Sequence, residues 1–194
     1  MSLDYLFLGL GWAMYYALHS LLASHWVKDA LARRWPRVGG YYRLGYNALA
    51  LFLLLLLVIW QYQLPTAYWW PPTLLARFLG GLLMAGGGFV MAATFRNYDT
   101  RAFLGLKPED ISAKSLTVNG LNRWVRHPLY LGVLFFIAGY VVWETSWRQL
   151  VFPLLTLLYL PIGIALEEQK LLARFGEAYG EYRAKVKMII PGIW

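Results

Sequence analysis

The stretch Arg126-His127-Pro128-Leu129-Tyr130-Leu131-Gly132 decides how this chain folds, because an apolar helix has to begin at its proline. Proline is tolerated in the first turn of a helix, where its missing N–H would be unpaired in any case. The N–H groups of Leu129, Tyr130 and Leu131 are then expected to be open, and such a helix start favours an anionic or acceptor-rich ligand. The pair Glu167-Glu168 ends the next apolar run, where carboxylates must face water, a partner or a cation. Together the two motifs favour a ligand that carries both signs of charge.

Composition assigns the class of protein. With 59% hydrophobic and only 14% charged residues in 194, the chain is predicted to be an integral membrane protein. Its apolar runs, numbered one to five below, cover residues 3–23, 44–64, 74–95, 129–143 and 150–166. We therefore expect an all-α, polytopic membrane protein with five transmembrane helices. Run one is long enough to span and lacks a basic leader, so we expect it to be retained rather than cleaved as a signal peptide.

The whole chain, residues 1–194, is expected to form a single membrane domain. Residues 1–118 would supply the first three helices and a cytoplasmic loop, and residues 119–194 a hairpin and a cytoplasmic tail. Run four has 15 residues, about 22 Å of helix, which is short of the roughly 30 Å of hydrocarbon. Runs four and five are therefore predicted to form a short, tilted hairpin, with Pro153 and Pro161 bending its second arm and a cavity open to the cytoplasm. The tail predicts an amphipathic helix that caps this cavity, with one apolar face of Leu171, Leu172, Phe175, Tyr179, Tyr182 and Val186.

Basic residues predict the orientation. Of the 18 Lys and Arg, all but Arg77 and Arg148 follow run one, follow run three or lie in the tail, and they include Arg37 and Lys114. By the positive-inside rule the N-terminus lies outside, and these basic segments are cytoplasmic. The same bias, with attraction to anionic lipid headgroups, accounts for the net charge of +8 without a nucleic-acid partner. The external turns carry aromatic residues suited to an interfacial belt: Trp69, Trp70, Trp143 and Trp147.

Several kinds of site are not supported by the sequence. The chain has no cysteine, and its three histidines (His19, His25 and His127) are scattered, so we expect neither a disulfide framework nor a metal site. Gly86-Gly87-Gly88 lies inside run three with no strand before it. This arrangement favours close helix packing over a phosphate-binding loop.

Each candidate motif also has a plainer interpretation. Arg126-His127-Pro128 alone fits a basic membrane anchor followed by a proline helix start. His19, inside run one, is either a site residue or a histidine that bonds across helices. Arg43 and Asn47 lie one helical turn apart at the start of run two, where lipid-headgroup anchoring explains them as well as ligand binding does.

The order of the motifs resembles that of a known superfamily. The proline stretch, a membrane hairpin, Glu167-Glu168, and then Phe175-Gly176-Glu177-Ala178-Tyr179 with Tyr182 and Pro191 are similar to the isoprenylcysteine carboxyl methyltransferase and phospholipid methyltransferase superfamily of integral membrane enzymes. The resemblance covers the chain from Asn119 to its end. It implies S-adenosylmethionine as cofactor, bound from the cytoplasmic side by the histidine-proline motif and the glutamate pair. The implied cofactor site consists of Arg126, His127, Pro128, Tyr130, Leu131, Glu167 and Glu168, with Tyr130, Tyr179 or Tyr182 stacking on adenine or facing the sulfonium.

Upstream motifs resemble a bacterial branch of this superfamily. They are His19-Ser20-Leu21-Leu22-Ala23-Ser24, Tyr42-Arg43 with Tyr46-Asn47, and Phe103-Leu104-Gly105-Leu106. That branch includes methanethiol S-methyltransferases and a group linked to denitrification genes. The resemblance implies a methyltransferase of the bacterial cytoplasmic membrane that acts on a small or lipophilic acceptor, with no obligatory protein partner.

The acceptor atom is left open between sulfur, oxygen and nitrogen. A simple thiol is mostly protonated at neutral pH, so its methylation calls for a base or a cation that favours the thiolate. We expect Arg43 to orient the acceptor and His19, or else His127, to receive the proton. The alternative function is a non-catalytic membrane accessory or carrier protein of the same fold.

Overall fold

The computed structural model describes residues 3–34, 41–96, 98–107, 116 and 118–192; Arg37 and Lys114 lie outside them. The described residues form eight α-helices, a 3-10 turn (Gly120–Arg123) and two isolated bridges, which confirms the all-α class. The helices are α1 (Leu3–Leu22), α2 (His25–Arg34), α4 (Tyr42–Gln63), α5 (Leu74–Phe95), α6 (Thr100–Leu104), α7 (Pro128–Trp143), α8 (Trp147–Phe175) and α9 (Glu177–Lys185).

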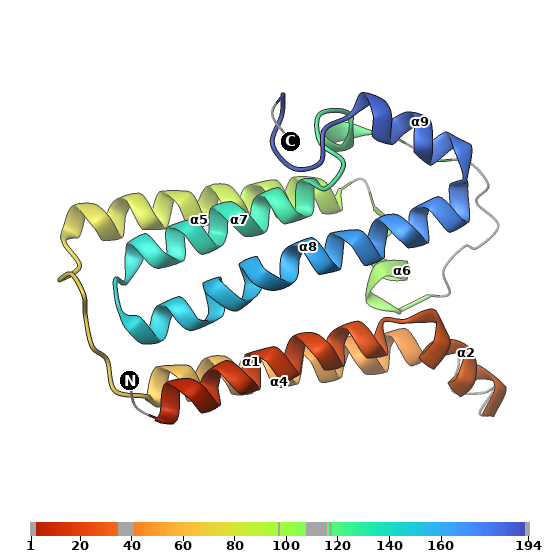
Figure 1. Ribbon diagram of the computed structural model, residues 1–194. Coiled ribbons are helices and arrows are strands. Elements are labelled where there is room, and N and C mark those ends of the chain that lie inside the picture. The colour runs from red at the N-terminus through yellow and green to blue at the C-terminus, as the bar shows by residue number, and fades with distance from the viewer. Residues whose placement is uncertain (1–2, 35–40, 97, 108–115, 117, 193–194) are drawn as a thin grey trace.

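The long helices form a bundle in which α8 lies between two helix pairs. Helices α1 and α4 run side by side on one side of it, and α5 and α7 on the other (Figure 1). The connections α4–α5 and α7–α8 meet at one end, where the Trp69 N–H donates to the Thr145 carbonyl at 3.1 Å. Helices α2, α6 and α9 lie at the opposite end. The motifs of the sequence analysis are therefore concentrated at the end that also carries most of the basic residues.

Three helices, α4, α5 and α8, are long and apolar enough to cross a membrane, and α7 is a shorter apolar helix of 16 residues. Helix α1 is not among these candidate spans, and it places polar side chains inside the bundle: the Tyr16 hydroxyl lies 2.6 Å from the Thr156 hydroxyl on α8. The outer surface is apolar, with Leu74 86% and Phe89 75% exposed. Side chains of this kind over the length of a helix indicate a lipid-facing surface, so the chain is a membrane protein.

Glycines bring α5 and α7 into close contact. A Cβ on Gly87 would lie 2.5 Å from the carbonyl oxygen of Gly132, and one on Gly80 would lie 2.7 Å from that of Gly139. Only glycine permits so close a backbone approach. The helix-packing interpretation is thus confirmed for Gly87, whereas Gly86 faces open space.

The second arm of the hairpin is longer than predicted. Helix α8 has 29 residues, about 43 Å, and it continues past the predicted end at residue 166 to Phe175. Pro153 and Pro161 lie within it without ending it. The helix stops at Gly176, whose φ of +52° favours glycine, and the chain turns into α9. The single amphipathic tail helix of the prediction is therefore divided between α8 and α9.

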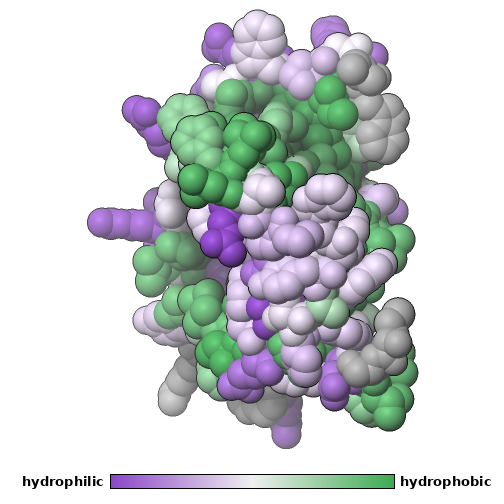
Figure 2. Space-filling model, turned by 90° about the vertical axis from the view of Figure 1, so that its left-hand side faces the viewer, coloured by the Kyte–Doolittle hydropathy of each residue, from purple (hydrophilic) through white to green (hydrophobic). Residues whose placement is uncertain are grey.

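Aromatic side chains gather at the end that carries the two connections. Figure 2 looks onto this end and shows side chains of intermediate hydropathy in its centre, with hydrophobic ones around them. The exposed aromatic residues of the connections are Tyr68, Trp69, Trp70, Trp143 and Trp147. Their position agrees with the interfacial belt expected from the sequence.

Candidate functional site

The start of α7 is held in place by the segment that follows α9. The Arg126 N–H donates to the Lys187 carbonyl at 2.8 Å, and the His127 N–H donates to the Met188 carbonyl at 3.0 Å. These bonds pair the segment after α9 with the residues just before α7, of which His127 is the last. A segment about 60 residues later in the chain thus fixes where the histidine-proline motif points.

The helix start offers fewer open donors than predicted. The Leu131 N–H donates to the His127 carbonyl at 3.1 Å, so it is not open. This is the first regular i to i−4 bond of an α-helix, which the presence of Pro128 does not prevent. Among the described residues, Leu129 and Tyr130 keep N–H groups at the helix start without an intrahelical partner. Leu131 instead packs against the apolar cluster of Leu160, Ile164 and Ile189.

Glu168 is the centre of a buried charge network. Its Oε1 accepts a hydrogen bond from Arg126 Nε at 2.8 Å and lies 3.1 Å from His127 Nε2. Its Oε2 lies 3.4 Å from Arg183 Nε. Both Glu168 and His127 are buried. A buried carboxylate is stable only when it is paired and hydrogen-bonded, and here the protein itself supplies the partners.

Arg126 connects this network to α9. Its Nη1 donates to the carbonyls of Arg183 at 3.0 Å and Val186 at 2.7 Å. The last carbonyls of a helix lack intrahelical partners, so the guanidinium satisfies groups that would otherwise need water. One arginine therefore joins α7, α8 and α9.

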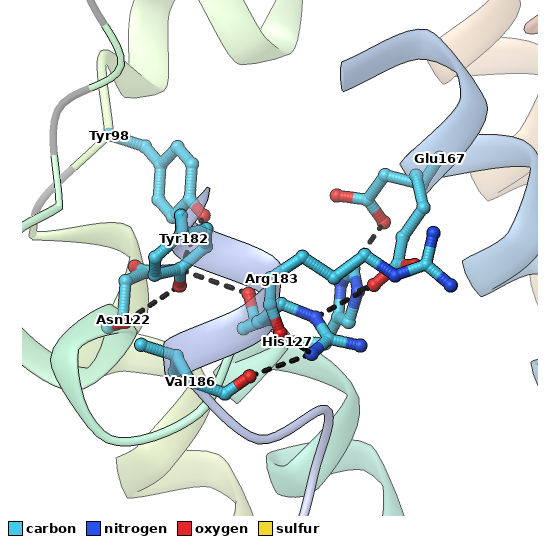
Figure 3. Close-up of polar contacts among 9 residues, drawn as sticks. Tyr98, Asn122, His127, Glu167, Tyr182, Arg183 and Val186 are labelled. Carbon is cyan, nitrogen blue, oxygen red and sulfur yellow. Dashed lines mark hydrogen bonds and ion pairs between the residues drawn. The ribbon is translucent and has the colours of Figure 1, made fainter. Parts of the chain in front are cut away.

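Glu167 has a different environment from its neighbour. Its side chain is 46% exposed, and its Oε2 lies 3.9 Å from His127 Nδ1; the two side chains point toward each other in Figure 3. Glu167 lines a pocket of about 70 Å³, which we call the α7 pocket. The other residues of this pocket are Thr94, Phe95, Tyr98, Phe103, Arg126, His127, Pro128, Leu129 and Tyr130.

Tyrosines of α9 and of the segment after α5 surround the network. The Tyr182 hydroxyl donates to the Asn122 carbonyl at 2.7 Å, and the Asn122 amide donates to the Tyr98 hydroxyl at 3.5 Å (Figure 3). Burial raises the pKa of Tyr182 to about 12, and burial with the nearby Glu167 charge raises that of Tyr98. Tyr179 is buried, and its hydroxyl has no hydrogen-bond partner among the described residues. All these phenols are therefore neutral near pH 7.

The two predicted catalytic residues lie outside the charge network. The Arg43 guanidinium lies over the Phe103 ring, 5.8 Å from its centroid, and Phe103 lines the α7 pocket. His19 lies in a separate cavity of about 10 Å³ between α1 and α4, beside the Tyr46 ring. Its buried Nδ1 has no partner in the described part of the chain. The structure thus joins Arg43 to the pocket through Phe103 and does not bring His19 to it.

Asn47 has a role that neither sequence interpretation included. Its amide donates to the carbonyls of Phe103 and Leu104 at 3.2 Å each. These are the final carbonyls of α6, so Asn47 fastens that short helix onto α4.

Sequence reasoning missed several residues of the site, among them Tyr98, Asn122 and Arg183. Tyr98 follows a membrane helix with no pattern around it, and Arg183 counted only as one of the basic tail residues. Asn122 lies four residues before Arg126, and its amide donates to the Arg126 carbonyl at 3.1 Å. That spacing, next to a recognised motif, is the only local signal that could have indicated one of them.

The described helices include apolar ones of membrane length, and a buried charge network lies beside a tyrosine-lined pocket. These features define a polytopic membrane protein with a candidate small-molecule site. The chain belongs to the NnrU family, whose model, described as NnrU protein, matches residues 7–192.

Several relatives of this chain carry the name methanethiol S-methyltransferase. Methanethiol S-methyltransferase 2 of Bradyrhizobium diazoefficiens is 32% identical over 149 residues, which are 73% of this chain and 57% of the relative. Methanethiol S-methyltransferase 1 of the same organism is 35% identical over 148 residues, 72% of this chain and 51% of the relative. Methanethiol S-methyltransferase of Mycobacterium tuberculosis is 29% identical over 145 residues, 71% and 59% of the two chains. The chain thus spans little more than half the length of these relatives. No solved structure matches it.

Proposed function

We propose that this chain is an integral membrane methyltransferase that transfers a methyl group from S-adenosylmethionine to a small thiol. The observation that carries the proposal is its similarity, over about 73% of its length, to proteins named methanethiol S-methyltransferase. The α7 pocket, with the histidine-proline motif and Glu167 in its wall, is the proposed cofactor site.

The groups around the pocket suit this cofactor. S-adenosylmethionine carries a carboxylate, an ammonium, a sulfonium and an adenine ring. The half-exposed Glu167 suits the ammonium or a ribose hydroxyl, and the N–H groups at the start of α7 suit the carboxylate. Tyr98 and Tyr130 offer rings for adenine or the sulfonium. The pocket, about 70 Å³, is smaller than the roughly 300 to 1,000 Å³ of most ligand sites, so it would hold only part of the cofactor.

The two glutamates have separate proposed roles. Glu167 contacts the cofactor, whereas Glu168 keeps Arg126 and His127 in position without touching it. The support is their surroundings, since Glu168 is buried against three basic partners and Glu167 is not. When bound, S-adenosylmethionine would supply an electrophilic methyl group on a positively charged sulfur.

The acceptor is proposed to enter between α1, α4 and α7. Arg43, beside the wall of the pocket, orients the thiol and favours its thiolate. His19, which lies in a cavity separate from the α7 pocket, is proposed to receive the proton, and its buried Nδ1 without a hydrogen-bond partner in the described chain supports this role. Alignment of acceptor and methyl group in a site that excludes water then provides most of the rate enhancement.

We further propose that α1 and α7 also cross the membrane, which gives five spans in one membrane domain of the bacterial cytoplasmic membrane. The support is that α1 runs alongside α4 and α8 for most of its length (Figure 1). The N-terminus would lie outside, and α2, α6 and α9 in the cytoplasm, because their end of the bundle carries most of the basic residues.

The test uses the purified protein in lipid nanodiscs. We expect it to bind radiolabelled S-adenosylmethionine, and we expect Glu167→Gln to weaken binding about tenfold or more, as loss of a charge-assisted bond does. Glu177→Gln, an exposed carboxylate on α9, is the matched control and should bind normally. Methyl transfer would then be measured with a panel of thiols, carboxylates and amines, and we expect transfer to thiols. Absence of cofactor binding by the wild type would favour the non-catalytic accessory or carrier alternative.

A further inference from the structure

A larger pocket lies against Glu168 and does not include Glu167. It has a volume of about 320 Å³, and we call it the α8 groove. Most of its wall is apolar: Leu160, Pro161, Ile164, Ala165, Leu172 and Met188. The rest of its wall is Glu168, Gln169 and Arg183. The groove therefore has a long apolar part and a short polar part.

The groove opens on the outer surface of the bundle at the boundary of the apolar run. Pro161, Ala165 and Gln169 are exposed residues spaced one helical turn apart along α8. The apolar run ends at Leu166, and the first charged residues follow directly. Four residues of helix rise about 6 Å, so the apolar part lies at the depth of acyl chains and the polar part at the depth of headgroups.

The accessible charge at the polar end is that of Arg183, because the Glu168 side chain is only 7% exposed and Arg126 is not part of the groove wall. Arg126 already pairs with Glu168 at 2.8 Å, and Arg183 approaches the other oxygen of the same carboxylate at 3.4 Å. Two guanidinium groups thus share one negative charge. The Arg183 side chain is 50% exposed, which leaves part of it accessible at the mouth of the groove. This end is complementary to an anion and not to a neutral or cationic head.

We propose that the α8 groove binds an anionic phospholipid of the surrounding leaflet. One acyl chain lies along Leu160, Ile164 and Ala165, and the phosphate lies against Arg183. The acyl chain and the phosphate of a bilayer lipid lie at the same depths as the apolar part and the polar part of the groove. The proposal does not depend on the methyltransferase function, because nothing in it requires the α7 pocket to be a cofactor site.

The experiment measures which lipids stay with the protein. The wild type is reconstituted in vesicles of equal amounts of phosphatidylglycerol and phosphatidylcholine, extracted in detergent and analysed by native mass spectrometry. We expect phosphatidylglycerol to be retained in preference to phosphatidylcholine. Arg183→Gln should lower its retention about tenfold, the loss expected for one charge-assisted contact. Lys185→Gln is the control, because Lys185 lies on the same helix but is 75% exposed and pairs with Glu181.

A second pair of variants tests the apolar part. Ala165→Phe should fill the groove and reduce retention of phosphatidylglycerol to a similar degree. Leu166→Phe, at the next exposed position and outside the groove, should retain the lipid. Equal retention of the two lipids by the wild type would overturn the proposal, as would equal losses in Arg183→Gln and Lys185→Gln, or normal retention in Ala165→Phe. Displacement of the lipid by inorganic phosphate would overturn its assignment as a phospholipid.

Discussion

Glu167 and Glu168 are neighbours in the chain, yet their side chains are 46% and 7% exposed. Successive residues of a helix point about 100° apart, so one faces the α7 pocket and the other faces the segment that folds back from α9. A carboxylate fixed by three basic groups stabilises the structure, and one with free surface is available to a ligand.

Substitution of Glu168 is therefore expected to affect stability, and substitution of Glu167 is expected to affect cofactor binding. Glu168→Gln should destabilise the protein by about 3 kcal/mol, because it removes the negative charge from buried basic partners. Glu167→Gln should change stability by less than about 1 kcal/mol, as for a partly exposed charge, while weakening cofactor binding. Thermal unfolding in detergent and calorimetric titration with S-adenosylmethionine measure the two effects. A larger stability loss in Glu167→Gln would contradict this division of roles.

A second prediction concerns proton transfer. If His19 receives the thiol proton, methylation should rise with pH through the titration of that group, and His19→Ala should lower turnover about a hundredfold while leaving cofactor affinity unchanged. The measurement is the initial rate of thiol methylation over a pH series, with cofactor binding as the control. A flat pH profile together with full activity in His19→Ala would remove His19 from the mechanism and favour an acceptor that arrives already ionised.

At the scale of elements, the contact between α5 and α7 depends on single glycines. Gly87→Ala should destabilise the protein by about 1 to 3 kcal/mol, because its Cβ would lie 2.5 Å from the Gly132 carbonyl and the helices would have to separate. Gly86→Ala is the matched control. Nothing lies within 4 Å of its Cβ, so the higher helix propensity of alanine should keep or slightly raise stability. Equal melting temperatures of the two variants would show that the close contact does not form.

The long helices could be predicted from the sequence because each of them corresponds to a run of apolar residues. Helices α1, α4, α5 and α7 begin and end within two residues of the predicted runs. The prediction failed at the end of α8, where the glutamate pair looked like a boundary. Glu168 stays inside the helix because Arg126 and Arg183, distant in sequence, neutralise it.

Contacts between residues that are distant in the sequence also limited prediction of the site. The histidine-proline motif and the glutamate pair carry local signals, and the fold does place them together. Tyr98 and Arg183 join them through contacts between segments that lie far apart in the sequence, which no spacing records, whereas Asn122 lies only four residues before Arg126.

At the scale of the whole molecule, the proposed orientation follows from the two ends of the bundle. A fluorescent protein joined to the C-terminus should fluoresce in the cytoplasm, and alkaline phosphatase at the same position should be inactive. The reporters should behave in the opposite way when they are inserted in the connection between α4 and α5, because that end carries the aromatic belt and few basic residues. An active phosphatase at the C-terminus would reverse the orientation.

The hydrogen bonds that fix the histidine-proline motif come from residues 183 to 188, which are synthesised after all the apolar helices that the structure describes. During translation α7 and α8 can insert into the bilayer, but the nascent chain cannot yet hold Arg126 in place. The histidine-proline motif in the wall of the α7 pocket is therefore fixed only when this segment has left the ribosome. A chain whose synthesis stalls before that point lacks a finished site for a reactive ligand.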